Sequence, residues 1–237
     1  MDYRRANNFF EVNMIKDYNS EKMRQITQRE IEFLSRIIPN KQILCLDVMC
    51  GYGRIANELY NNGYINIEGI DIGNFDLISE EKQFKFYNQN FYTWNSEKKY
   101  DFCYSLYNSY PNYKNFIDTI NKCYEILTTK GIMVIDIFSK EWRDSISNEN
   151  SRIVYEDDKT LVKLSRLFDG INEKSTYIVL DKTTNIEKTF TFSQCTITKE
   201  KLAEIIPHKW DYYITDSLEE KTRMDNQKNI LILRKKG

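Results

Sequence analysis

Residues 42–54 of the chain read QILCLDVMCGYGR and combine three local signals. The continuous apolar run over 42–48 is typical of a strand buried on both faces of a sheet. Gly51 and Gly53 interrupt it, and residues 54–63 continue as a helical pattern that ends at a glycine. A strand followed at once by a glycine turn and a helix lets backbone N–H groups and the helix N-terminus approach a ligand closely. The stretch therefore predicts a ligand site at this turn.

Strands and helices alternate on both sides of this stretch. The pattern predicts helices over 20–38 and 115–127, and strands over 65–71, 84–90, 100–108 and, after a Lys-Gly turn, 131–138. Alternation over about a hundred residues favours a parallel sheet with right-handed crossovers. The sequence therefore predicts a Rossmann-like α/β fold.

The pattern changes in the second half of the chain. Residues 152–195 contain four strand-like runs separated by DDK, DGINE and KTTN turns, which is typical of antiparallel hairpins. A helix is expected over 198–206, followed by strands over 211–218 and 228–236. No repeat or low-complexity linker divides the chain. We therefore expect a single domain, 1–237, that carries an antiparallel β insertion over 150–196.

Composition narrows the function classes. Lys and Arg total 34 and Asp and Glu total 35, giving a net charge of -1 without the basic excess of nucleic-acid binders. No apolar run approaches the roughly 20 residues that cross a bilayer, and the N-terminus lacks a signal peptide's apolar region. The five cysteines form no CxxC pair, so no metal site is indicated. We expect a cytoplasmic protein, and the abundance of Ile, Asn, Lys and Tyr suggests an AT-rich bacterial genome.

Two carboxylates bear on which ligand the glycine turn binds. Asp71 ends the second strand, and an acid there can accept hydrogen bonds from both hydroxyls of a ribose. The pattern from Gly51 through Gly53 to Ala56 also fits the dinucleotide fingerprint G-x-G-x-x-G/A. Asp47, four residues before the first glycine, argues against a pyrophosphate and favours an ammonium group.

The quoted stretch resembles the first motif, D-x-x-C-G-x-G-R, of the class I S-adenosylmethionine-dependent methyltransferases, in particular the small-molecule, glycine N-methyltransferase-like group. GIDIG at 69–73 is similar to the second motif, and the resemblance extends over most of the chain. It implies a seven-stranded sheet of order 3-2-1-4-5-7-6 with strand 7 antiparallel, and S-adenosylmethionine as the cofactor.

The resemblance also implies roles for individual residues. It places the following residues at the cofactor: Arg24, Asp47, Cys50, Gly51, Gly53, Asp71, Ile72, Asn90, Phe91 and Leu106. Asn90 stands where the family usually has Asp beside the adenine amino group, and its side-chain oxygen can still accept that hydrogen bond. Tyr107 and Asn108, at the end of the fourth strand, are the catalytic candidates.

Each assignment has a structural alternative. Asp47 can simply cap the turn, Asp71 can be a surface turn residue, and Arg24 can be a solvated helix charge. His208 is the only histidine of the chain, and its place after a helix favours a structural role over that of a general base.

The expected reaction is methyl transfer to a small-molecule N- or O-acceptor. The alternatives are a peptide, protein or RNA acceptor, a cofactor-binding module without turnover, and a nicotinamide enzyme. We expect residues 1–40 to form a helical lid over the cofactor and the 150–196 insertion to cap the acceptor pocket. Tyr107, Asn108 and Tyr110 would floor that pocket, and Arg166 or Phe168 would line it. The alternative role for the insertion is a homodimer interface.

Overall fold

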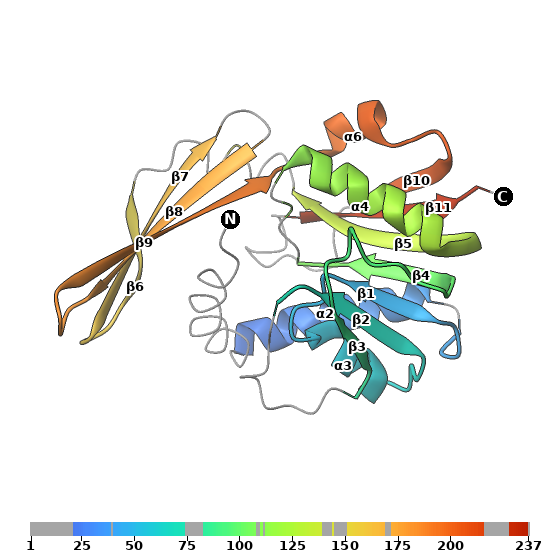
Figure 1. The fold of residues 1–237 in the computed structure, drawn as a ribbon, viewed down its shortest axis with the longest axis horizontal. Helices are drawn as coiled ribbons and strands as arrows, with labels where there is room; N and C mark the ends of the chain where they lie inside the picture. Colours follow the sequence, from blue (N-terminus) through green and yellow to red (C-terminus); the bar gives the residue numbers. More distant parts are fainter. Residues whose placement is uncertain are drawn as a thin grey trace.

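The computed structural model describes residues 21–38, 40–73, 83–107, 110, 112–138, 144, 151–168, 172–215 and 228–236. They form a seven-stranded sheet of order β10-β11-β5-β4-β1-β2-β3 (Figure 1). Its strands are β1 (Cys45–Val48), β2 (Ile67–Asp71), β3 (Lys85–Asn88), β4 (Tyr100–Ser105), β5 (Leu127–Phe138), β10 (Trp210–Thr215) and β11 (Lys228–Lys235). Strands β1 to β5 pair in parallel, whereas β11 is antiparallel to both β5 and β10. The expected strand order and the antiparallel last strand are confirmed.

Helices cover both faces of this sheet. Helices α2 (Glu21–Ile37) and α3 (Arg54–Asn61) share a buried apolar cluster on one face. On the other face, α4 (Tyr113–Ile126) and α6 (Lys199–Ile205) contribute to a second cluster. Strand β1 shows how one strand serves both, because Cys45 belongs to the first cluster and its neighbour Leu46 to the second. Burial on both faces explains why the strand reads as a continuous apolar run.

Two of the strand boundaries that differ from the sequence prediction have a local backbone cause. Strand β5 begins at Leu127, four residues earlier than expected, and passes through Lys130 and Gly131 rather than starting after them. Lys130 has φ 67, and the pairing register of β4 with β5 shifts at this point, so the Lys-Gly pair is an irregularity within a strand and not a turn. Strand β4 ends at Ser105 instead of residue 108, since Tyr107 has φ 62 and cannot continue an extended chain.

The insertion forms a separate antiparallel sheet of order β6-β7-β8-β9. Its strands are β6 (Arg152–Glu156), β7 (Thr160–Phe168), β8 (Asn172–Asp181) and β9 (Ile186–Cys195). The sheet projects from the side of the molecule to which the carboxyl end of β5 points (Figure 1). At its return to the main sheet, the Cys195 N–H donates to the Tyr110 carbonyl oxygen at 2.5 Å. The insertion is thus tied to the loop after β4.

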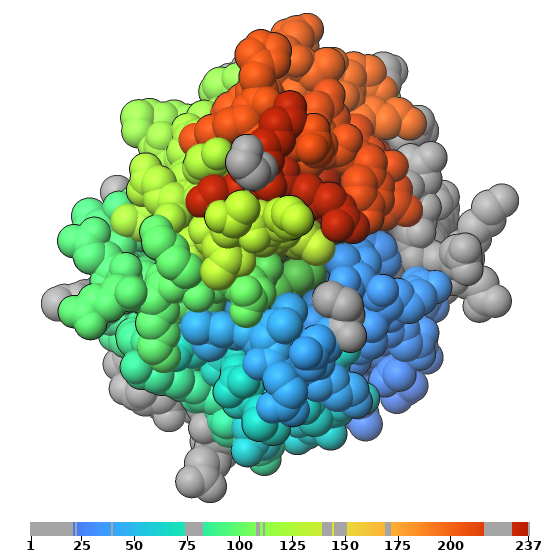
Figure 2. Space-filling model, turned by 90° about the vertical axis from the view of Figure 1, so that its right-hand side faces the viewer, coloured from blue at the N-terminus to red at the C-terminus, as the bar shows by residue number. Residues whose placement is uncertain are grey.

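The opposite end of the molecule presents a continuous surface in which β5 and β11 lie side by side (Figure 2). Across the described ranges, no helix is both long and apolar enough to cross a bilayer. Residues 1–20 and 39 of the expected helical lid, 1–40, lie outside the described residues.

Candidate functional site

The turn after β1 contains two glycines with different reasons for being glycine. Gly51 has φ 56 and Gly53 has φ 81, both in the left-handed region that favours glycine. A Cβ at Gly53 would lie 2.2 Å from the Phe84 ring, so packing excludes any side chain there. A Cβ at Gly51 would have no heavy atom of the described residues within 4 Å. Gly51 therefore borders open space, as a residue that a ligand approaches closely must.

Asp71 closes this turn against the end of β2. Its Oδ2 accepts a hydrogen bond from the Gly51 N–H at 2.8 Å, and its Oδ1 accepts one from the Gly73 N–H at 2.7 Å. A carboxylate oxygen has two lone pairs and can accept more than one hydrogen bond. The carboxylate thus lies directly beside the open space at Gly51 and stabilises the turn, and its expected role as the ribose acid stays a prediction.

Asp47 lies beneath the turn, with only 3% of its surface exposed. It is the register partner of Tyr104 on β4 and points to the face covered by α2 and α3. Burial raises the pKa of Asp47 well above the ordinary value, although the nearby Arg54 charge and the Tyr104 hydroxyl oppose the shift. A carboxylate held in this way gains most from a cationic ligand, because such a ligand restores the favourable interactions lost on burial.

A buried ion pair that sequence reasoning missed lies on the same side. Arg54, the first residue of α3, donates from Nη1 to Glu30 Oε2 at 2.5 Å and to Thr27 Oγ1 at 2.6 Å. The two side chains of the ion pair are 11% and 8% exposed. The arginine stood in the quoted motif, but no local pattern indicated its partner on α2.

Tyr107 lies at the carboxyl end of β4, close to a second residue that was missed. Its side chain is 41% exposed, and its N–H donates to Asp136 Oδ2 at 2.8 Å. Asp136 is itself buried near the end of β5. An acid inside the apolar run GIMVIDIF was the available signal. Asn108, the other catalytic candidate, lies outside the described residues.

Asn90 and Phe91 have structural roles in addition to those expected. Asn90 Oδ1 accepts the Tyr92 N–H at 3.0 Å, so one lone pair of the expected adenine acceptor is already used in a local turn. Phe91 is buried in the α4 and α6 cluster. Adenine recognition through Asn90 would use the remaining lone pair of the same oxygen.

The other expected cofactor residues are spread around the turn. Cys50 is half-buried at the end of β1, and Leu106 is buried in the α2 and α3 cluster. Ile72 is 50% exposed directly after the ribose acid. Arg24 is exposed near the start of α2, one helical turn before Thr27, and so lies on the side of α2 from which the ion pair to α3 is made.

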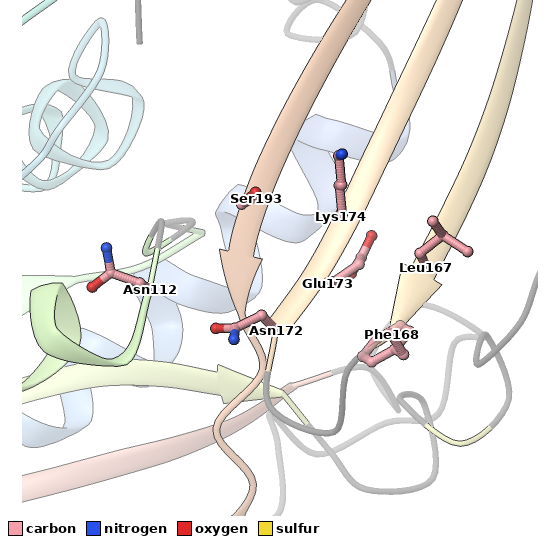
Figure 3. A pocket seen from close by; sticks show the side chains of 7 residues that line it. All are labelled: Asn112, Leu167, Phe168, Asn172, Glu173, Lys174 and Ser193. Atoms are coloured by element: carbon pink, nitrogen blue, oxygen red, sulfur yellow. The ribbon is translucent and has the colours of Figure 1, made fainter.

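A hollow of about 410 Å³ lies between the insertion and the start of α4 (Figure 3). Asn112 lies on the α4 side of the hollow, and the other lining residues belong to strands β7, β8 and β9 (Figure 3). Together they are Asn112, Leu167, Phe168, Asn172, Glu173, Lys174 and Ser193. Amide, hydroxyl and charged groups beside an aromatic ring suit a polar small molecule.

Glu173 gives this hollow a buried charged wall. Its side chain is fully buried, and Arg166 Nε lies 3.0 Å from its Oε1. Ser175 Oγ donates to Oε1 at 2.5 Å and Gln194 Nε2 donates to Oε2 at 2.6 Å. Of the two residues expected to line the acceptor pocket, Phe168 borders the hollow, whereas Arg166 pairs with the acid that borders it.

Two further expectations concern metals and the single histidine. Within the described ranges, no group of three or more His, Cys, Asp and Glu side chains is placed to hold a metal ion. His208 is exposed in the turn between α6 and β10, where its carbonyl oxygen accepts a hydrogen bond from Lys236 Nζ at 2.7 Å.

The chain is similar in fold to several solved methyltransferase structures. The chain is similar to the CcbJ methyltransferase from Streptomyces caelestis, at 13% identity and TM-score 0.73 over 89% of this chain and 90% of that one. An S-adenosylmethionine-dependent methyltransferase from Clostridium acetobutylicum matches at 14% identity and TM-score 0.70 over 99% of both chains. The amino pentose methyltransferase CalS10 from Micromonospora echinaspora, with S-adenosylmethionine bound, matches at 13% identity and TM-score 0.66 over 96% of both. No protein-family model and no curated protein matches the sequence. The fold is that of the class I S-adenosylmethionine-dependent methyltransferases.

Proposed function

We propose that this protein is an S-adenosylmethionine-dependent methyltransferase that acts on a small-molecule N- or O-acceptor. One observation carries the proposal: among the described residues, carboxyl groups lie beside the open space at Gly51 and beneath its turn. Asp71 borders it directly, and Asp47 lies beneath the same turn, where it interacts electrostatically with Asp71, Glu30 and Arg54. Asp71, Glu30 and Asp47 outnumber the one arginine, and a positively charged ligand would also stabilise the ionised form of the buried Asp47.

This charge balance separates the two cofactors that the glycine pattern allows. S-adenosylmethionine carries a sulfonium and an ammonium group, whereas the pyrophosphate of a dinucleotide carries negative charge to the glycine turn. Buried carboxylates at this turn would repel a pyrophosphate and attract an ammonium. The site therefore favours S-adenosylmethionine over NAD.

The residues present fit this cofactor, and different residues would bind the cofactor and the acceptor. When bound, S-adenosylmethionine supplies the activated methyl group. Asp71 would accept the ribose hydroxyls, and Asp47 would face the ammonium. Tyr107 and Asn108 would border the acceptor. The protein's task is to align the acceptor with the methyl group and exclude water, and such alignment can supply up to roughly 7–11 kcal/mol in ideal cases.

The hollow between α4 and the insertion supports a small acceptor. Its amide, hydroxyl and charged lining matches a polar molecule, and CalS10, one of the similar structures, is described as an amino pentose methyltransferase. We propose that the insertion caps this hollow and that an amine or hydroxyl of a small polar molecule is methylated. An insertion that instead forms a homodimer interface is the alternative.

Calorimetry with S-adenosylmethionine, S-adenosylhomocysteine and NAD tests the cofactor. We expect the first two to bind and NAD not to bind; binding of NAD alone would refute the proposal. Methyl incorporation from labelled cofactor into a panel of small amines and alcohols then tests the acceptor class. Incorporation into peptides and not into small molecules would favour the peptide alternative.

The cap is tested by replacing residues 152–194 with a short Gly/Ser loop. The replacement keeps Cys195, whose N–H meets the Tyr110 carbonyl oxygen. Cofactor affinity should remain and methyl transfer should disappear. A shortened protein that changes only from dimer to monomer and keeps its activity would establish the interface role instead.

A further inference from the structure

Arg54 contacts three segments that meet at the candidate cofactor site. It follows Gly53 directly in the chain, so its backbone continues the glycine turn. Its Nη1 reaches Thr27 and Glu30, which lie one turn apart on α2. Its guanidinium carbon lies 5.6 Å from the centre of the Tyr107 ring, a distance at which a cation is attracted to an aromatic face.

The tyrosine is itself held in place. Its backbone has φ 62, an uncommon conformation for a residue other than glycine, and Asp136 Oδ2 accepts its N–H at 2.8 Å. Arg54 therefore contacts a ring whose backbone is fixed from β5. A shift of the arginine side chain would disturb the ring at the acceptor side and α2 on the other side together.

Stability alone is a weak reason for this arrangement. Buried ion pairs add little net stability, because removing two charges from water offsets most of their attraction. For Arg54, burial lowers the pKa, but the charge of Glu30 and its hydrogen bond outweigh burial and leave the pKa raised. The guanidinium is thus permanently charged beside Asp47, where its positive charge favours the ionised form of that acid.

We propose that Arg54 is a positioning residue that couples cofactor binding at the glycine turn to the placement of α2 and of the Tyr107 ring. The proposal rests on the proposed function, since it takes S-adenosylmethionine as the ligand of the turn. When the cofactor binds at the glycine turn, it restrains the start of α3. Arg54 then restrains α2 through its ion pair with Glu30, and restrains the acceptor side through its contact with the Tyr107 ring.

The first test measures the affinity for S-adenosylhomocysteine by calorimetry. Arg54→Met, which keeps the length of the chain but not the charge, should bind at least about tenfold more weakly than the wild type. Arg54→Lys keeps the charge but lacks the several N–H donors of a planar guanidinium, so its affinity should lie between those of the wild type and Arg54→Met. Glu30→Gln should weaken the affinity for S-adenosylhomocysteine a few-fold. The Glu30→Gln/Arg54→Met double variant should bind no worse than Arg54→Met, because both changes break one interaction.

The second test uses a readout that a merely structural role would not move. Hydrogen exchange of α2 should slow when S-adenosylhomocysteine is added to the wild type, and this added protection should be lost in Arg54→Met. Tyr107→Phe keeps the ring and should behave as the wild type, whereas Tyr107→Leu should lose part of the affinity. Tyr107 is 41% exposed, so these variants also report on the coupling if the arginine variants do not fold.

Glu68→Gln is the matched control. Glu68 is also a buried acid; it accepts hydrogen bonds from Tyr100 at 2.6 Å and Tyr87 at 3.0 Å and pairs with Lys98. The control should lower the melting temperature and leave the affinity and the α2 response unchanged. Folded Arg54→Met and Tyr107→Leu variants that bind S-adenosylhomocysteine and show the α2 response as the wild type does would overturn the coupling alone. A wild type that fails to bind S-adenosylhomocysteine would overturn the proposed function and the coupling with it.

Discussion

Replacing Gly51 with asparagine separates the ligand's need for space from the protein's own packing. Gly51 has φ 56, and asparagine adopts this left-handed region more readily than other side chains do. A Cβ at this position has no heavy atom within 4 Å, so the protein itself accommodates the new side chain. Valine would also fill the space, but its branched side chain would add backbone strain and so confuse the two effects.

The expected magnitudes follow from this geometry. The left-handed backbone costs an ordinary residue about 1–2 kcal/mol, and asparagine less. For a domain of this size, 1 kcal/mol lowers the melting temperature by about 2–4 °C, so the variant should melt less than about 8 °C below the wild type. The side chain would enter the space that the ligand needs. We expect the affinity for S-adenosylhomocysteine to fall by about a hundredfold or more, equivalent to about 2.8 kcal/mol.

Thermal unfolding and calorimetry measure the two quantities on the same samples. Gly63→Asn is the control, because Gly63 also has a left-handed backbone, φ 89, and the Lys41 side chain is no closer than 3.6 Å to its Cβ position. This control should lose a little stability and no affinity. A folded Gly51→Asn protein whose affinity stays within about threefold of the wild type would refute the idea that the ligand approaches the backbone at this turn.

Three further outcomes follow from the same site. Asp71→Ala should weaken S-adenosylhomocysteine binding by roughly 1–3 kcal/mol in calorimetry and also lower the melting temperature, since the Gly51 N–H loses its acceptor. Asp47→Asn should weaken binding without lowering the ligand-free melting temperature at neutral pH. Burial raises the pKa of Asp47, so wild-type stability falls as pH rises from 3.8 through the folded-state pKa, and a melting series should show that this slope is missing in the variant. Gly53→Ala should be strongly destabilised in thermal unfolding, because its Cβ would meet Phe84 at 2.2 Å, and unchanged stability would contradict the packing argument.

The main sheet was predictable because its signals are local. A strand buried on both faces reads as an apolar run, and a glycine turn with φ 56 and φ 81 reads as Gly51 and Gly53. The error at β5 has a local cause as well. Lys130 takes φ 67 inside a strand, a conformation that a Lys-Gly pair more often takes in a turn. Sequence periodicity cannot distinguish a Lys-Gly turn before a strand from a Lys-Gly irregularity within one, because the difference depends on how β5 pairs with β4.

The side-chain pairs of the candidate site were not predictable in the same way. Arg54 meets Glu30 across 24 residues, and Tyr107 meets Asp136 across 29. Each pair joins two elements whose separate patterns are unremarkable: an arginine after a glycine turn, an acid on a helix, an acid in an apolar strand. Only the packing of α2 on α3, and of β4 on β5, brings the partners together.

The placement of the charges that favour one cofactor over the other was also not predictable from the sequence. The whole chain has a net charge of -1, a nearly even balance that lacks the basic excess of nucleic-acid binders and says nothing about a cationic ligand. The discrimination between an ammonium and a pyrophosphate depends instead on where Asp47, Glu30, Asp71 and Arg54 lie. Asp47 and Glu30 are buried, so water screens their charges less than it screens the many charges on the surface. The placement of these four residues, rather than the total, therefore determines which ligand the glycine turn favours.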